Sequence, residues 1–131
     1  MSLFKKYLLN KKVIITGHTG FKGSWLTLWC ILSGARVFGI SNSYVSEPSH
    51  FKNLNLKKNM KNYNVDIRNL KKLKKVFTKI QPDYVFHLAA QSLVKRSFEK
   101  PLETFSSNTI GTLNILNALL ILKKRCHAVI I

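Results

Sequence analysis

The sequence predicts a single-domain α/β protein built on a doubly wound parallel sheet of about five strands. Short apolar runs rich in β-branched residues alternate along the chain with stretches in which apolar residues recur at helical spacing. Strands that alternate with helices form parallel sheets through right-handed crossovers. The chain has 131 residues, 46% of them hydrophobic, which is enough for one packed core but too few for two domains of ordinary size.

The first part of the chain is expected to contain two buried strands separated by a helix. Residues 13–16 are four consecutive β-forming residues. Residues 21–33 follow as a helix whose apolar side chains cover most of its circumference, and Gly34 is the residue type that most often ends a helix. Residues 35–41 form the second strand. These segments make a strand–helix–strand unit.

The middle of the chain is expected to be a polar loop followed by a third strand and an amphipathic helix. Residues 42–62 are mostly polar and contain a Glu-Pro pair, with one helical turn near residues 51–54. Residues 63–66 form the third strand. Asn69 can cap the next helix, which runs to about residue 80 because its apolar residues recur at helical spacing.

The last part of the chain repeats the alternation. Pro82 ends the preceding helix, because proline lacks an N–H donor and clashes with the turn before it. Residues 83–90 form the fourth strand. Pro101 begins a long helix that runs to about residue 124, and residues 127–131 form the fifth strand, which we expect to be truncated there.

Three glycines at steps of three residues lie between the first strand and the first long helix. Gly17 permits a tight turn, Gly20 lets a pyrophosphate approach the backbone, and Gly23 lets the helix pack closely on the strand. The free N–H groups of Phe21 and Lys22 at the helix start then favour an anion. We interpret this turn as a dinucleotide site in a Rossmann-like fold; the alternative is a glycine-rich turn without a ligand.

Two further stretches lie at the carboxyl ends of expected strands, where ligands of open parallel sheets bind. After the third strand, Asp66 can accept a hydrogen bond from an adenine amino group, or it can serve only as a turn carboxylate. After the fourth strand, Ala89 and Ala90 leave room for a ribose and phosphates. His87 precedes them and has a structural alternative, a hydrogen-bonded histidine at a strand end.

The charge balance suggests a polyanionic partner, but the charge distribution argues against one. Lysine and arginine number 22 against 5 acidic residues, which gives a formal net charge of +17. The lysines form scattered short clusters, and arginine, which reads phosphates and bases better, occurs only four times. We expect solvated lysine-rich helix faces. A basic nucleic-acid-binding protein remains the less favoured alternative.

The remaining sequence signals indicate a cytoplasmic protein without metal. Cys30 and Cys126 lie far apart with no metal-ligand spacing, which favours free thiols in a reducing compartment. Lysines interrupt the amino-terminal apolar residues, so they do not form a signal-peptide core. No apolar run approaches the roughly 20 residues that span a bilayer.

Four segments together resemble a known family. The segments "TGHTGFKGSWL", "VDIRN", "VFHLAAQSLVKRS" and "NTIGTLNILNAL" are similar to the extended short-chain dehydrogenase/reductases, the NAD-dependent epimerase/dehydratase family, and most closely to the CDP-glucose 4,6-dehydratases. The resemblance covers nearly the whole chain from Val13. "GHTGFKGSW" is its specific part, because the wider superfamily usually has a branched apolar residue at the position of Lys22.

The resemblance implies a redox-neutral lyase that uses tightly held NAD. In this family NAD takes hydride from C4 of the glucose ring, water leaves across C5 and C6, and the hydride returns to C6. The complete family members are homodimers that act on a nucleotide sugar. By resemblance, the pyrophosphate lies on Gly17, Thr19, Gly20, Phe21, Lys22 and Gly23, and the adenine lies on Asp66 and Ile67. The resemblance places the ribose and nicotinamide side of the cofactor on Leu88, Ala89, Ala90, Gln91 and Asn108. It places the sugar nucleotide near Ser92 and Arg96.

The chain departs from the family pattern at two places. Ser43 stands where the family usually has an acidic residue for the adenosine ribose, which leaves NADP open beside NAD. The catalytic Tyr-x-x-x-Lys pair follows the fifth strand in the family and is not in this chain; Tyr7 is followed by Lys11 but precedes the first strand.

We therefore expect residues 1–131 to be a dinucleotide-binding domain that is incomplete at its C-terminus, without a substrate domain, and inactive alone. A non-catalytic module that binds a dinucleotide is the main alternative.

Overall fold

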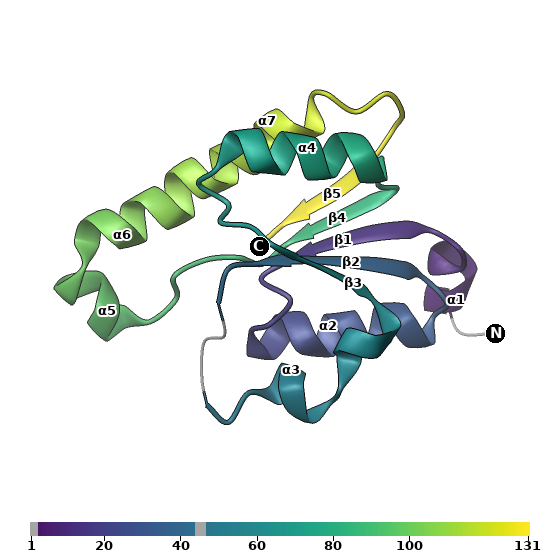
Figure 1. Ribbon diagram of the computed structural model, residues 1–131, viewed down its shortest axis with the longest axis horizontal. Coiled ribbons are helices and arrows are strands. Elements are labelled where there is room, and N and C mark those ends of the chain that lie inside the picture. Colours follow the sequence, from purple (N-terminus) through teal and green to yellow (C-terminus); the bar gives the residue numbers. More distant parts are fainter. Residues whose placement is uncertain (1–2, 44–46) are drawn as a thin grey trace.

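The computed structural model describes residues 3–43 and 47–131 and contains a five-stranded sheet with the order β3-β2-β1-β4-β5. All paired strands are parallel (Figure 1). This order matches the Rossmann arrangement, and β1 and β4 flank its topological switch point. The predicted fold class is confirmed. The strands are β1 Lys12–Thr16, β2 Arg36–Ser41, β3 Lys61–Asn64, β4 Tyr84–His87 and β5 His127–Ile130.

Helices cover both faces of the sheet (Figure 1). On one face α2 packs beside α3, and α1 joins them through an edge-to-face contact between Phe4 and Trp29, with ring centroids 5.5 Å apart. On the other face α4 packs beside α7. The helical segments are α1 Leu3–Leu8, α2 Phe21–Leu32, α3 His50–Asn53, η1 Leu56–Asn59, α4 Leu70–Ile80, α5 Val94–Glu99, α6 Pro101–Phe105, η2 Ser106–Ile110 and α7 Gly111–Leu119.

The central strand β1 is buried on both faces because its side chains alternate between two cores. Val13 and Ile15 pack with Leu8 and Cys30 under α2, whereas Ile14 packs in the larger core under α4 and α7. Strands buried on both sides are expected to be continuously apolar, as residues 13–15 are. The glycine turn after β1 is thus attached to the most constrained strand of the sheet.

The end of α2 and the start of α4 agree with the sequence. Gly34, at φ +79°, ends α2 by donating to the Ile31 carbonyl oxygen at 2.9 Å, while Ala35 donates to that of Cys30 at 3.0 Å. This pair of bonds is a Schellman motif. At the start of α4 the Asn69 side chain accepts a hydrogen bond from the Lys72 N–H at 3.0 Å, as a helix cap does.

The third and fourth strands differ from the expected bounds. β3 runs two residues earlier than the expected 63–66, because it pairs only with β2 and their ladder ends at Ser41 and Asn64. β4 stops at His87 rather than running to residue 90, because its partner β1 ends at Thr16. The expected loop 42–62 therefore contains η1 and the start of β3, and its residues 44–46 lie outside the described part of the chain.

The long helix expected from Pro101 to about residue 124 is also corrected. The helical segment contains a π-helical turn, η2, and its last helix, α7, ends at Leu119. It ends early because the chain must return to the sheet: the Gln81 side chain accepts from the Lys123 N–H at 2.9 Å, and His127 donates to the Asp83 carbonyl oxygen at 2.9 Å. The sequence analysis missed α1 and α5, since both are short and neither shows a helical repeat of core residues.

Candidate functional site

A cleft of about 630 Å³ opens beyond the carboxyl ends of β1 to β4, where ligands of open parallel sheets bind. The residues expected from the sequence come together there, with one exception. Asn108 is not part of the cleft wall and lies behind it. The expected residues that line the cleft are Gly17, Thr19, Gly20, Phe21, Lys22, Gly23, Asp66, Ile67, Leu88, Ala89, Ala90, Gln91, Ser92 and Arg96.

Two of the three glycines are required by the fold itself. Gly17 has φ +72°, and a Cβ atom there would lie 2.8 Å from the Ala89 backbone nitrogen. A Cβ atom on Gly23 would lie 2.2 Å from the Gly17 carbonyl oxygen. Both contacts are closer than real Cβ atoms approach, so the predicted roles of these two glycines in the turn and in helix packing are confirmed.

Gly20 is different, because its backbone does not require glycine. Its φ of −74° and ψ of 170° are extended values that any residue adopts. It occupies the N-cap position of α2, and no side chain caps that helix end. The first N–H groups of a helix have no partner within the helix, and the aligned peptide dipoles add positive charge there. The uncapped turn therefore fits a pyrophosphate group.

Hydroxyl groups tie the glycine turn to the end of β2. Thr19 donates its hydroxyl hydrogen to the Ser43 carbonyl oxygen at 2.7 Å, and Ser41 donates to the same oxygen at 2.9 Å. Thr19 was expected among the pyrophosphate ligands. In this structure its hydroxyl holds the chain after β2 against the turn.

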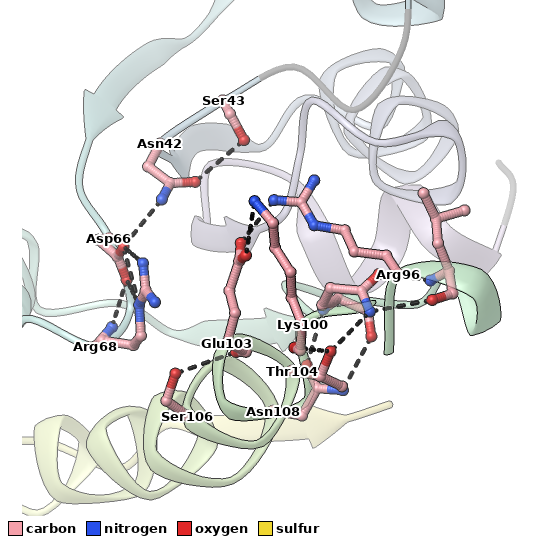
Figure 2. Close-up of polar contacts among 12 residues, drawn as sticks. Asn42, Ser43, Asp66, Arg68, Arg96, Lys100, Glu103, Thr104, Ser106 and Asn108 are labelled. Atoms are coloured by element: carbon pink, nitrogen blue, oxygen red, sulfur yellow. Dashed lines mark hydrogen bonds and ion pairs between the residues drawn. The ribbon is translucent and has the colours of Figure 1, made fainter. Parts of the chain in front are cut away.

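Asp66 lies at the cleft with its carboxylate already engaged (Figure 2). Arg68 donates to it through Nε at 3.0 Å, Nη2 at 2.5 Å and its backbone N–H at 2.8 Å, and Asn42 donates through Nδ2 at 3.0 Å. The hydrogen bonds from Arg68 hold the pKa of Asp66 below its usual value, against the opposing effect of burial. The turn role considered for Asp66 is therefore realised, and a contact with adenine remains a prediction.

His87 is a buried histidine with both ring nitrogens bonded. Its Nδ1 lies 2.6 Å from the Thr16 hydroxyl, and its Nε2 lies 3.0 Å from the Thr112 hydroxyl. Thr112 donates its own hydrogen to the Asn108 carbonyl oxygen at 2.7 Å, so it must accept from His87 Nε2. Nδ1 then accepts from Thr16, and the ring is neutral. Burial lowers the pKa of His87 to about 4, and the structural alternative considered for this residue is confirmed.

Asn108, on the π-helical turn η2, holds the cleft wall in place from behind. Its Oδ1 accepts from the Gln91 N–H at 2.8 Å, and its Nδ2 donates to the Gln91 carbonyl oxygen at 3.0 Å. Gln91 in turn donates through Nε2 to the Thr104 hydroxyl at 3.0 Å. These bonds attach the segment after β4 to the helix above it, so Asn108 acts on the cleft through Gln91.

The neutral His87 predicts a specific loss of stability in acid. An unfolded histidine has a pKa near 6.5, so between that value and about 4 the unfolded chain binds the extra proton. The contribution of the neutral His87 to the free energy of unfolding is complete above pH ~6.5. It falls by about 3 kcal/mol as the pH is lowered toward about 4. Urea unfolding at neutral pH and at about pH 4.5 should show a smaller decrease for His87→Gln than for the unmodified chain; equal decreases would contradict this assignment.

The sequence analysis missed several polar residues of the cleft. The missed residues are Arg68 and Asn42, which donate to Asp66, and Glu103, which accepts from Nη2 of the expected Arg96 at 2.7 Å (Figure 2). Asp66 and Arg68 are two residues apart within one turn, and this spacing could have predicted the contact between their side chains. The contact between Arg96 and Glu103 has no such signal, because it joins two separate helices, α5 and α6.

Among residues 3–43 and 47–131, no helix is long and apolar enough to span a membrane. In the same ranges, no group of three or more His, Cys, Asp and Glu side chains could hold a metal ion.

Comparisons with known proteins place the chain among enzymes of nucleotide sugars. Residues 14–131 match the family model of GDP-mannose 4,6 dehydratase. The chain is 44% identical over 112 residues to CDP-glucose 4,6-dehydratase of Salmonella typhimurium, covering 86% of this chain and 31% of the relative. It is 33% identical over 122 residues to GDP-mannose 4,6-dehydratase of Vibrio cholerae, covering 85% and 32%. The chain thus spans about a third of the length of these relatives.

Solved structures resemble the fold as well. UDP-glucose 4-epimerase of Thermotoga maritima, solved with UDP-glucose, superposes with a TM-score of 0.77 at 30% identity, covering 91% of this chain and 37% of that one. The Thermus thermophilus UDP-glucose 4-epimerase, solved in complex with NAD, gives a TM-score of 0.73 at 31% identity, covering 82% and 33%.

Proposed function

The chain belongs to the GDP-mannose 4,6-dehydratase family, and we propose that it is the NAD-binding part of a nucleotide-sugar 4,6-dehydratase that converts CDP-glucose to CDP-4-dehydro-6-deoxyglucose. The 44% identity to a CDP-glucose 4,6-dehydratase supports this choice of nucleotide sugar. The activity belongs to a protein of the relatives' full length, of which this chain covers about a third.

One observation carries the cofactor proposal: the uncapped amino end of α2 faces the cleft beside Gly20, at the carboxyl edge of the sheet. The pyrophosphate would lie on this turn, with Lys22 adding a positive charge at the cleft. The adenine would lie at the end of β3, beside Asp66 and the buried Ile67. The NAD bound in the Thermus thermophilus epimerase supports the same cofactor class.

The segment from Leu88 to Gln91 forms the cleft wall at the end of β4, which is next to β1 at the switch point. Ala89 and Ala90 present only methyl groups there, which leaves room for the ribose and nicotinamide. Asn108 fixes this wall by pairing with both backbone groups of Gln91. NAD, when bound, supplies the hydride acceptor of the reaction. This chain orients it, and Ser92 and Arg96 lie on the side of the cleft that would meet the sugar nucleotide.

A second copy of the chain is the partner we propose. The continuous helical segment from α6 to α7 exposes an apolar stripe formed by Leu102, Phe105, Leu113 and Leu116. Exposed apolar stripes at helical spacing favour helix–helix pairing. Sedimentation velocity tests it, and a monomer at the highest soluble concentration would contradict this pairing.

The second candidate function is a dinucleotide-binding module without catalysis. It is favoured by the positions of the groups that could act as a base. His18 and His87 are each 2% exposed, and Tyr84 lies at the amino end of β4, on the edge of the sheet opposite the cleft. The expected cofactor contacts are thus together in this chain, whereas His18, His87 and Tyr84 do not line the cleft.

Calorimetric titration of the folded chain with NAD tests the proposal. We expect saturable binding with one site per chain. Absence of a binding signal, in a sample whose circular dichroism and urea unfolding show a folded α/β protein, would contradict both candidate functions.

A further inference from the structure

The outer surface of α1 and α2 has a group of exposed aromatic and aliphatic side chains. On α2, Trp25, Trp29 and Leu32 are 44%, 54% and 72% exposed and recur at helical spacing, so they share one face of the helix. α1 extends this face, because the Phe4 ring lies edge-on to Trp29 with ring centroids 5.5 Å apart. Tyr7 follows Phe4 by three residues and is exposed as well. We call Phe4, Tyr7, Trp25, Trp29 and Leu32 the aromatic face.

Lysines accompany the aromatic face on the same elements. Residues 1–65 contain ten lysines and arginines but one acidic residue, Glu47. α1 and α2 themselves contain no acidic residue. Both helices lie on the same side of the sheet (Figure 1), and η1 packs against α2. The exposed lysines on α1, α2 and η1 are Lys5, Lys6, Lys22, Lys57 and Lys58.

Two carboxylates belong to segments beside the aromatic face, and each has a lysine of its own. Glu47, just before α3, pairs with Lys52. Asp83, at the amino edge of the sheet, accepts from the Lys12 backbone N–H at 2.8 Å and pairs with Lys124 at 2.5 Å. The face and the lysines beside it therefore present a net positive charge.

Elsewhere in the described part of the chain, exposed apolar side chains and positive charge are separate or balanced. α4 has five lysines but no exposed large apolar side chain. The α6 to α7 stripe is apolar, and residues 101–119 contain no lysine or arginine. On α5, Phe98 is exposed beside basic residues, but Glu99 and Glu103 pair with those residues. Both tryptophans of the chain lie on the aromatic face.

We propose that the aromatic face docks on the surface of an anionic lipid bilayer. Tryptophan and tyrosine favour the level of the headgroups, because their rings are largely apolar and have one polar group. Interfacial helices lie in the plane of the bilayer surface with their apolar side buried about 5–10 Å. α2 thus inserts Trp25, Trp29 and Leu32 between the lipids. Lys5 and Lys6 of α1 meet the anionic headgroups.

Other partners fit this face less well. A second copy would bring two lysine-bearing faces together, and like charges repel. A single-stranded nucleic acid is bound by arginine and by stacking platforms, whereas this face has lysines, a leucine and an edge-on aromatic pair. The inference does not depend on a bound cofactor, because the residues of the aromatic face do not line the cleft.

Vesicle binding by the 131-residue chain tests the proposal through its own fluorescence, since both tryptophans belong to the aromatic face. The probes are vesicles of phosphatidylcholine alone and of phosphatidylcholine and phosphatidylglycerol in equal parts. With the anionic vesicles we expect a blue shift of the tryptophan emission and quenching by brominated lipids. Binding to phosphatidylcholine alone should be about tenfold weaker or more.

Matched variants separate the face from the general charge of the chain. Trp29→Gln with Leu32→Gln should weaken vesicle binding about tenfold or more. Phe98→Gln with Leu120→Gln removes two exposed apolar side chains elsewhere and should leave it unchanged.

A second pair of variants changes charge alone. Lys5→Glu with Lys6→Glu should weaken binding about tenfold or more. Lys71→Glu with Lys72→Glu makes the same charge change on α4 and should weaken binding much less. Circular dichroism and urea unfolding verify that each variant is folded.

Four results would overturn the inference. The first is no binding to anionic vesicles, or binding without quenching of the tryptophans. The second is an equal loss from the two lysine pairs, which would show only a general attraction to the net charge of +17. The third is a response of the tryptophan emission to a single-stranded oligonucleotide at lower concentration than to anionic vesicles. The fourth is lipid-free self-association that Trp29→Gln with Leu32→Gln abolishes, which would assign the face to a second copy.

Discussion

Replacing Gly20 with valine is expected to weaken dinucleotide binding at least about a hundredfold while the chain stays folded. The backbone at Gly20 is extended, at φ −74° and ψ 170°, and valine readily adopts such values. The cost to the fold is therefore limited to a poorer N-cap, about 1 kcal/mol. The branched side chain would instead stand where the pyrophosphate approaches the amino end of α2, and a few kcal/mol of steric conflict corresponds to the expected loss of affinity.

Gly23→Ala is the matched control for this experiment, because it tests packing rather than ligand approach. Its Cβ atom would lie 2.2 Å from the Gly17 carbonyl oxygen, so the helix must move away from the turn. Overpacking of this kind costs about 1–3 kcal/mol or more. Urea unfolding should separate the two variants: Gly23→Ala loses much more stability than Gly20→Val. Unchanged NAD affinity in folded Gly20→Val would show that the cofactor does not use the glycine turn.

The glycine turn shows how far the sequence predicts this site. The spacing of Gly17, Gly20 and Gly23 after a buried strand is local information, and the turn and packing follow from it. Local pattern also predicts α4, because its cap and its apolar repeat lie within twelve consecutive residues, 69–80. The backbone of Gly20 is ordinary, so the role predicted for this glycine depends on the approach of a ligand, which stays a prediction.

The parts that the sequence did not predict depend on pairing between distant segments. β3 takes its bounds from β2, and no pattern within residues 61–66 reveals where β2 stops. Asn108 was expected to face the cofactor, but its side chain is used by Gln91, seventeen residues earlier. Asn108 lies on the π-helical turn η2, which the helical spacing of the sequence did not predict. Such contacts are set by the assembled fold.

The largest expected effect concerns activity: the purified 131-residue chain, given CDP-glucose and NAD, should form no 4-keto-6-deoxy sugar. The resemblance to extended short-chain dehydrogenase/reductases implies a tyrosine base assisted by a lysine, and the chain has no Tyr-x-x-x-Lys pair except Tyr7 with Lys11, which precedes β1. General-base help of this kind is typically worth a factor of about 10² to 10⁴.

The other candidate bases of the chain do not replace the missing pair. His87 is buried, its two nitrogens are bonded to Thr16 and Thr112, and its pKa of about 4 makes it a weak base. His18 is buried as well, with Nε2 at 2.7 Å from Asn62 Oδ1. Tyr84 stacks on His127 at the amino edge of the sheet, with ring centroids 5.4 Å apart, away from the cleft.

Loss of positioning should lower the rate further and independently of the base. The chain covers about a third of the length of its relatives. An assay of this chain alone therefore lacks any contact by which the other segments of the relatives hold the nucleotide sugar over the nicotinamide. Orientation can account for roughly 7 to 11 kcal/mol of a reaction barrier, which puts turnover far below detection when combined with the missing base.

An overnight incubation of the chain with CDP-glucose and NAD tests this expectation. The keto sugar is measured by its alkaline absorbance, and a full-length CDP-glucose 4,6-dehydratase is the positive control. Turnover by this chain alone would show that a group within it reaches the substrate, and it would overturn the assignment of His18 and His87 to the buried scaffold.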